Sequence, residues 1–171
     1  MHMQLKQIGT IHSRFKEPAG TLLQPVFAED ETGTVEILPE FVDGLRDLKG
    51  FERIWLLYWF HLASPARLRV TPFRDTLERG VFASRAPCRP NPLGLSCVRL
   101  LGIEGNVLTI GGVDALDGTP LLDIKAYVPE YDAFPSSRAG WLDQRAMKRT
   151  HADHRFSKPA PTTDKAQRID P

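Results

Sequence analysis

The chain lacks features that define several large classes of protein. Its 171 residues include only two cysteines, Cys88 and Cys97, too few for a disulfide framework or a four-cysteine zinc site. The longest uninterrupted apolar run, residues 54–60, has seven residues, far fewer than the ~20 of a membrane-spanning helix. Residues 1–13 show no apolar stretch followed by a small-residue cleavage site. We therefore expect reduced thiols, no membrane association and a cytoplasmic protein.

The common catalytic and cofactor signatures are also missing. The sequence has no G-x-G-x-x-G fingerprint, Walker loop, H-E-x-x-H motif or nucleophile elbow. The stretch His151-x-Asp153-His154 offers some metal-binding side chains but no complete ligand set. We therefore expect no metal cofactor.

Charge is unevenly distributed along the chain, although the formal net charge is only +1. Residues 29–52 carry eight acidic and two basic side chains, whereas residues 67–99 carry seven arginines, no lysine and two acidic side chains. From residue 138 onward there are eight basic and four acidic side chains. Arginine favours planar contact with phosphate or carboxylate groups. The central block therefore indicates either phosphate or nucleic-acid binding, or a solvated surface that pairs with the acidic block.

Short apolar or alternating segments separated by turns predict a mainly β protein. The expected strands are residues 4–11, 33–38, 51–62, 67–71, 80–84, 95–101, 107–113 and 121–127, with Gly105-Asn106 as a hairpin turn. The helical candidates are residues 39–48 and 140–151. These segments predict a compact, mainly β domain over residues 1–137, either a barrel or a curled sheet, with few short helices and a short helical C-terminal extension over 138–156. Residues 157–171 are polar and contain three prolines, so we expect a disordered tail.

The loop that contains Pro87, Pro90 and Pro92 is the most unusual stretch of the sequence. Proline fixes φ and removes a backbone donor, so this loop is stiff and is not a central strand. Arg85 and Arg89 lie four residues apart on it. A stiff loop loses little freedom on binding, which makes these arginines a candidate anion clamp. The alternative is a rigid connection across a barrel end with solvated arginines.

A second candidate site lies on the strand expected at residues 121–127. Asp123 and Lys125 are two residues apart and share one strand face with Tyr127, whereas Leu122 and Ile124 face the opposite side. With the apolar pair turned to the core, the polar face offers a proton acceptor, a cation and a hydroxyl. The alternative is an exposed ion pair worth less than ~1 kcal/mol.

Five stretches, in this order, span residues 5–135. They are Ile8-Gly9-Thr10-Ile11-His12-Ser13-Arg14-Phe15-Lys16, residues 48–61, Gly80-Val81-Phe82-Ala83-Ser84-Arg85, Arg89-Pro90-Asn91-Pro92-Leu93-Gly94-Leu95-Ser96, and Asp117-Gly118-Thr119-Pro120 with Asp123-Ile124-Lys125. Together they resemble the TsaA/TrmO-like (YaeB) family of S-adenosylmethionine-dependent tRNA methyltransferases. The resemblance implies a single β-barrel, a homodimer with the methyl donor near the subunit interface, and N6-methylation of threonylcarbamoyladenosine beside the tRNA anticodon.

The family's donor site falls on residues from several parts of this sequence. By resemblance these are Gln24, Pro25, Phe60, His61, Arg85, Leu95, Gly111, Gly112, Val113 and Asp114. The sequence departs from the family in having Leu22-Leu23 before Gln24, where Pro-Arg is frequent. It also continues for only about 35 residues after the barrel motifs, whereas characterised bacterial members carry a larger C-terminal domain.

Methyl transfer is an in-line displacement that depends on alignment of donor and nucleophile. A modified adenine nitrogen reacts once its proton is removed, and Asp123 is the expected proton acceptor, with Tyr127 in reserve. Arg89, Asn91 and Lys125 are expected to bind the substrate. Three binding partners are possible for Arg85 and Arg89: RNA phosphates, the threonyl carboxylate or the donor carboxylate. The alternative function is an S-adenosylmethionine-binding or RNA-binding module without turnover.

Overall fold

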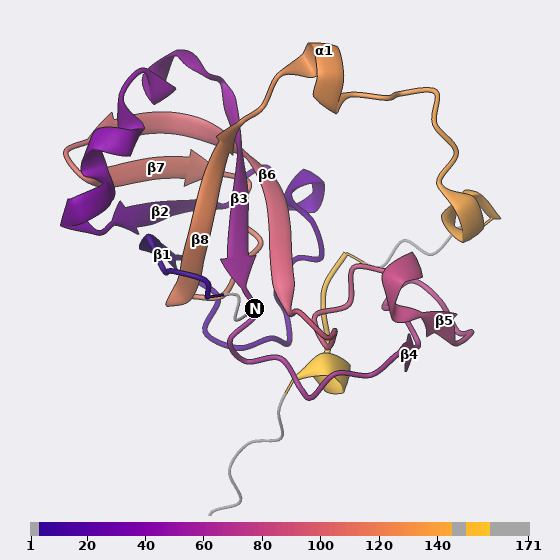
Figure 1. The fold of residues 1–171 in the computed structure, drawn as a ribbon. Coiled ribbons are helices and arrows are strands. Elements are labelled where there is room, and N and C mark those ends of the chain that lie inside the picture. The colour runs from indigo at the N-terminus through magenta and orange to yellow at the C-terminus, as the bar shows by residue number, and fades with distance from the viewer. Residues whose placement is uncertain (1–3, 145–149, 158–171) are drawn as a thin grey trace, which may run out of the picture.

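Six strands form a closed antiparallel barrel in the order β1-β2-β7-β6-β3-β8, with β8 returning to β1, in the computed structural model (Figure 1). The structure describes residues 4–144 and 150–157. The barrel strands are β1 (Gly9–His12), β2 (Thr32–Ile37), β3 (Arg53–Trp59), β6 (Leu93–Glu104), β7 (Val107–Gly111) and β8 (Thr119–Ala126). The expected mainly β barrel is confirmed.

The remaining elements are short. They are the hairpin strands β4 (Arg69–Val70) and β5 (Arg79–Gly80), the helix α1 (Pro129–Asp132), and the 3₁₀ helices Pro25–Phe27, Pro39–Leu45, Leu48–Gly50, Val81–Ala83, Gly140–Gln144 and His154–Phe156. In the described part of the chain, no helix has the length and apolar character needed to cross a membrane.

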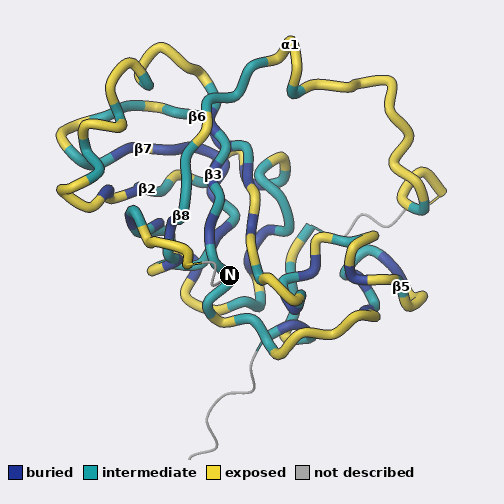
Figure 2. The backbone as a smooth tube through the Cα atoms, viewed as in Figure 1, coloured by how far each residue is buried: buried dark blue, intermediate teal, exposed yellow. Residues whose placement is uncertain are grey.

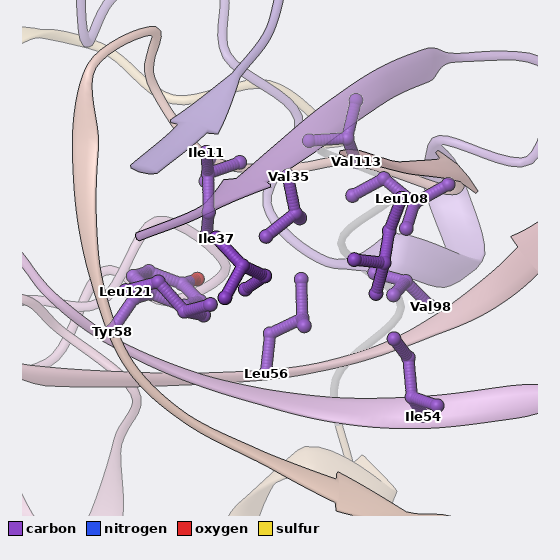
Figure 3. Close-up of a cluster of buried hydrophobic side chains, with 12 residues drawn as sticks. Ile11, Val35, Ile37, Ile54, Leu56, Tyr58, Val98, Leu108, Val113 and Leu121 are labelled. Atoms are coloured by element: carbon purple, nitrogen blue, oxygen red, sulfur yellow. The ribbon is translucent and has the colours of Figure 1, made fainter. Parts of the chain in front are cut away.

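Strict alternation along the strands builds the core inside the barrel. In β3, Ile54, Leu56 and Tyr58 are buried, whereas the residues between them are half-buried and face outward. Figure 3 shows these side chains meeting residues of β1, β2, β6, β7 and β8, among them Ile11, which is fully buried. Closure of the sheet pairs every barrel strand on both sides and leaves no open edge.

A second layer lies beside the barrel, where the segment 61–92 and the C-terminal segment 150–157 meet. Phe156 is buried against Val70, Val81 and Cys88 and makes an edge-to-face contact with Phe73. Isolated bridges join Leu22 to His151 and Ala63 to Ser157. Figure 2 shows the buried part of this layer separated from the barrel interior. Residues 150–157 therefore pair with two loops, at Leu22 and Ala63, that are far from them in sequence.

Two expected elements change type in the structure, whereas an expected turn is found. Residues 39–48 form two 3₁₀ segments, because Asp47 takes a left-handed conformation (φ 64°) that interrupts any continuous helix. The strand expected at residues 80–84 ends at Gly80 and continues as the 3₁₀ helix Val81–Ala83. The hairpin turn Gly105-Asn106 is confirmed, with Gly105 at φ 59°.

The expected C-terminal helix is correct only in part. Residues 140–144 form a 3₁₀ helix, residues 145–149 lie outside the described residues, and His151 is extended in its bridge with Leu22. Of the tail predicted to be disordered, only Ser157 is described, and residues 158–171 lie outside the described residues. The domain boundaries at residues 137 and 156 stay predictions.

Candidate active site

A cleft of about 1150 Å³ lies between the end of the barrel and the second layer. We call it the main cleft. Among the residues expected from the sequence, those that line it are Gln24, Phe60, His61, Arg85, Arg89, Asn91, Leu95 and Asp114. Aromatic side chains of Tyr58 and Phe27 also line it. An apolar cavity with a few convergent polar groups is typical of small-molecule sites, and this volume slightly exceeds their usual range.

A smaller cavity of about 400 Å³ adjoins the main cleft on the outer side of β3 and β6. We call it the side groove. Its lining residues are Gln24, Pro25, Val26, Phe27, Glu29, Arg53, Trp55, Arg74, Arg85, Cys97, Arg99, Gly111 and Gly112. Gln24, Phe27, Arg74 and Arg85 line both cavities, so the two are neighbours that share one wall. Val113 lines neither and is buried in the barrel core.

A chain of hydrogen bonds leads from the main cleft into the barrel core. The Ser96 hydroxyl donates to Asp114 Oδ1 at 2.6 Å. The Tyr58 hydroxyl lies 3.0 Å from Ser96 Oγ. Asp114 is half-buried and lines the main cleft, whereas Ser96 and Tyr58 are only 2% and 4% exposed. Asp114 therefore presents a carboxyl group to the cleft and is held by the buried Ser96 hydroxyl, which is bonded in turn to the Tyr58 hydroxyl.

Burial raises the pKa of Asp114 to about 7, against the opposing effects of the Ser96 hydrogen bond and the positive charge of Arg85. Burial also raises the pKa of the Tyr58 hydroxyl, and the negative charge of Asp114 adds to the rise. The Tyr58 hydroxyl thus stays neutral, and Asp114 is the group of this network that changes its ionisation near neutral pH. A carboxyl group with a pKa near 7 in a cleft is suited to accepting a proton from a bound substrate.

The two loop arginines have different environments. Arg85 is exposed, and its guanidinium donates to the side-chain oxygen of Gln24. Arg89 is half-buried, and its Nη1 donates to the backbone carbonyls of Ser84 and Ala86 at 3.1 and 3.2 Å. Arg89 therefore cross-links its own loop, which is the role of a structural connection, whereas Arg85 lies between the two cavities.

This difference predicts opposite outcomes for two alanine variants. Arg89→Ala should lower the free energy of unfolding by about 1–2 kcal/mol, because two carbonyls lose a charged donor. Arg85→Ala should leave thermal stability nearly unchanged and weaken binding of an anionic ligand, because it removes an exposed guanidinium. Thermal melts and calorimetric titrations on both variants check this. Equal loss of stability in the two variants would contradict the assignment.

Asp123, Lys125 and Tyr127 lie together, but on the outside of the barrel. Lys125 Nζ is 2.7 Å from Asp123 Oδ2, with the two side chains 63% and 44% exposed. The Tyr127 ring packs against Trp55, with ring centroids 5.9 Å apart. None of the three lines the main cleft or the side groove. The geometry matches the alternative considered for this strand, an exposed ion pair, and offers Asp123 no route to a ligand in the main cleft.

The expected core face of β8 is shifted by a bulge. The β3–β8 register pairs Leu57 with Asp123 and Tyr58 with Leu121, so Leu122 has no partner between them. Leu121 is fully buried and Ile124 packs against the core, whereas Leu122 is only half-buried. The prediction that Leu122 faces the core is wrong, because the bulge replaces it with Leu121.

The histidine-rich stretch near the C-terminus shows no metal geometry. Among the residues that the structure describes, no group of three His, Cys, Asp or Glu side chains could hold a metal ion. Asp153 instead accepts a hydrogen bond from Arg155 Nη2 at 2.8 Å. The expectation that no metal is needed stays a prediction.

Comparisons with known proteins agree on one family. Residues 10–133 match the family model described as tRNA-methyltransferase O N-terminal domain. The chain is 51% identical over 153 residues to a probable S-adenosyl-L-methionine-binding protein of Pyrococcus abyssi, a match that covers 88% of this chain and 83% of that protein. It is 33% identical over 148 residues to the tRNA (adenine(37)-N6)-methyltransferase of Escherichia coli, covering 81% of this chain and 63% of that enzyme.

A solved structure confirms the fold. The crystal structure of TrmO from Pseudomonas aeruginosa superposes with a TM-score of 0.71 at 44% identity, covering 82% of this chain and 62% of that chain. The chain therefore spans less than two thirds of the length of the Escherichia coli and Pseudomonas aeruginosa proteins.

Proposed function

Because the chain belongs to the tRNA-methyltransferase O N-terminal domain family, we propose that it transfers the methyl group of S-adenosylmethionine to N6 of an adenosine in tRNA. The observation that carries this proposal is the main cleft. It gathers Gln24, Phe60, His61, Arg85 and Asp114 from distant parts of the sequence beside the second layer. The expected target is threonylcarbamoyladenosine next to the anticodon. A tRNA substrate implies that the protein works in the cytoplasm.

The residues of the main cleft fit the methyl donor. S-adenosylmethionine supplies an electrophilic methyl group on a sulfonium and carries an adenine, a ribose and an amino-acid end. Phe27 and Phe60 offer apolar contact area for the adenine. Arg85 is suited to the donor carboxylate, and Gln24, to which it is bonded, brings an amide to the same place. The volume of about 1150 Å³ also leaves room for a target base.

Within the cleft, we propose Asp114 rather than Asp123 as the proton acceptor. Methylation breaks the carbon–sulfur bond of the donor and forms a carbon–nitrogen bond at N6, and the N6 proton leaves to the Asp114 carboxylate. Asp114 lines the cleft and is held by Ser96, whereas Asp123 is paired with Lys125 outside it. A positioned carboxylate of this kind typically contributes a 10²–10⁴-fold rate increase. Asn91, exposed at the cleft, is the proposed contact to the target nucleotide.

We also propose that the protein is a homodimer. The outer faces of β3 and β6 pair Leu57 with Leu95 and Trp59 with Leu93. Leu93 and Leu95 remain 38% and 47% exposed. Contiguous apolar side chains on the outside of a barrel are typical of an interaction surface. A second copy placed there would cover Leu95 at the edge of the main cleft.

Two measurements on the full chain test the function. Calorimetric titration should show S-adenosylmethionine binding that a chelator does not abolish, to a protein that sediments as a dimer. Radiolabelled methyl transfer to tRNA from cells lacking the modification should show turnover. Binding without transfer would favour the alternative, a donor-binding module, which is consistent with the name of the Pyrococcus abyssi relative. No donor binding at all would contradict the proposal.

A further inference from the structure

The side groove is lined by arginines that face one another. Arg53 of β3 and Arg99 of β6 are direct cross-strand partners on the outer face of the barrel. Arg74 and Arg85 complete the set of four, and the one acidic residue that lines the groove is Glu29. Like charges directly opposite on neighbouring strands destabilise a sheet. Their placement around one groove therefore needs a reason other than stability.

Three of these arginines are not neutralised by carboxylates. In residues 4–144 and 150–157, Arg53, Arg85 and Arg99 are in no ion pair, whereas Arg14, Arg69, Arg79 and Arg155 each are. Arg99 Nη2 donates to the Glu29 backbone carbonyl at 2.6 Å, and Arg85 bonds the Gln24 amide. These partners are neutral, so they orient the guanidinium groups without pairing their charge; the charge of Arg85 also acts on the Asp114 carboxyl.

An aromatic ring accompanies the positive charge. Trp55 follows Arg53 on the same face of β3, two residues along the strand, and lines the side groove. The indole is half-buried and is supported by the Tyr127 ring, at a tilt of 57°. A positively charged groove with an aromatic platform is the combination that binds single-stranded nucleic acid, with phosphates on the arginines and a base on the ring.

We propose that the side groove binds single-stranded RNA next to the target nucleotide, with Arg53 and Arg99 on phosphates and a flanking base stacked on Trp55. The groove adjoins the main cleft at Gln24 and Arg85, which line both, so a strand in the groove would lead to the cleft. This inference rests on the proposed function, because it deepens how the tRNA is held. The Arg53–Arg99 pair is six residues along the β3–β6 ladder from the Trp59–Leu93 pair, about 20 Å at 3.4 Å per residue. The Trp55–Cys97 pair of the groove is two residues from the Leu57–Leu95 pair, about 7 Å, so the groove adjoins the proposed dimer surface and its arginines lie at the far end.

The salt dependence of RNA binding tests the phosphate contacts. We would measure binding of an unmodified tRNA transcript by fluorescence anisotropy between 50 and 200 mM salt, roughly the range over which phosphate contacts are most visible. Arg53→Gln and Arg99→Gln should each lower the slope of log affinity against log salt by about one. Arg53→Lys and Arg99→Lys should keep the slope, because they keep the charge. Trp55→Leu should weaken binding about tenfold with the slope unchanged, because stacking is not ionic.

Arg69→Gln is the matched control. Arg69 is exposed on β4, is paired with Glu78 at 3.1 Å, and lines neither cavity. It should leave the slope unchanged. The glutamine variants in the groove should also retain the wild-type affinity for S-adenosylmethionine in calorimetry, and their KM for RNA should rise.

Three outcomes would overturn the inference. If the wild type methylates tRNA but Arg53→Gln and Arg99→Gln keep the wild-type slope, the groove does not hold phosphates and the proposed function stands. If these variants instead change the sedimentation coefficient from dimer to monomer, the groove is an interface between copies. If the wild type binds the donor but no RNA, the proposed tRNA substrate fails together with the groove.

Discussion

Asp114→Asn should reduce kcat for methyl transfer by roughly 10²–10⁴-fold, the range of general-base catalysis. The amide keeps the size of the side chain and its bond from the Ser96 hydroxyl, but it cannot accept a proton at neutral pH. Donor affinity should fall far less than kcat, because an interaction made in the transition state is lost. Single-turnover assays with saturating donor measure the chemical step directly.

The pH dependence of kcat gives an independent readout of the same group. With its pKa raised to about 7 by burial, Asp114 is protonated below that pH, so kcat should rise with pH through about 7 and then level off. Ser96→Ala removes a hydrogen bond that lowers this pKa, so the rise should move to higher pH. Arg85 and Tyr58 are the other charged or titratable groups that act on Asp114. The Tyr58 pKa lies too high to produce the profile.

The same pKa shift affects stability. An aspartate in an unfolded chain loses its proton near pH 4, whereas folded Asp114 keeps it to about pH 7. Between these values the folded state binds the extra proton, so the free energy of unfolding falls as pH rises, and the loss is complete above about pH 7. Urea unfolding at pH 5 and pH 8 should therefore show a smaller decrease for Asp114→Asn than for the wild type.

Asp123→Asn is the matched control for the predicted effects of Asp114→Asn on turnover and stability. Asp123 is an aspartate of comparable chemistry that is 44% exposed and paired with Lys125 on the outside of the barrel. An exposed pair of this kind contributes less than ~1 kcal/mol, so Asp123→Asn should show nearly normal turnover and stability. If Asp123→Asn loses activity and Asp114→Asn does not, the proton acceptor lies outside the main cleft and our assignment is wrong.

Gly94→Ala should strongly destabilise the barrel. Gly94 pairs with Tyr58 across β6 and β3, and a Cβ built on it would lie 2.1 Å from Tyr58 Cε2. The Tyr58 ring is buried and holds the Ser96 hydroxyl, so it cannot move without breaking the network. We expect a loss of about 3 kcal/mol in the free energy of unfolding, or roughly 6–12 °C in Tm for a chain of this size.

A second glycine on the same strand provides the control. Gly102 of β6 has open space where its Cβ would be, with no atom within 4 Å and no positive φ. Gly102→Ala should therefore change stability by less than about 1 kcal/mol. Thermal and urea unfolding of both variants makes the comparison. Equal stability of the two variants would show that the Tyr58 ring is not held as described.

The sequence was sufficient to predict a mainly β fold because short strand-like segments and turns such as Gly105-Asn106 are visible in a few consecutive residues. The uninterrupted apolar run 54–60 does not show that Ile54, Leu56 and Tyr58 face the core. The bulge that leaves Leu122 unpaired depends on the β3–β8 register, which no short window of sequence contains. The sequence therefore predicted which residues share a strand face with Asp123. It did not predict that this face lies outside the cleft.

The candidate site was predictable to a similar degree. The proline-rich loop indicated a rigid element. Which of its two arginines can bind a ligand depends on how the loop folds, because the fold places the carbonyls of Ser84 and Ala86 against the Arg89 guanidinium. The network of Tyr58, Ser96 and Asp114 joins residues as much as 56 positions apart in the sequence. Only the strand register brings them together, so chemical pattern alone indicated none of these contacts.

Closure of the barrel between its first and last strands has a consequence for synthesis of the chain. β1 ends at His12, and its partner β8 begins at Thr119. At 5–20 residues per second, the ribosome needs about 5–20 s to make the intervening residues. During that interval β1 has no β8 to pair with, and an unpaired strand edge is a template for association with other chains. The nascent protein is therefore most exposed to misassembly, and to chaperone binding, before Thr119–Ala126 leaves the ribosome.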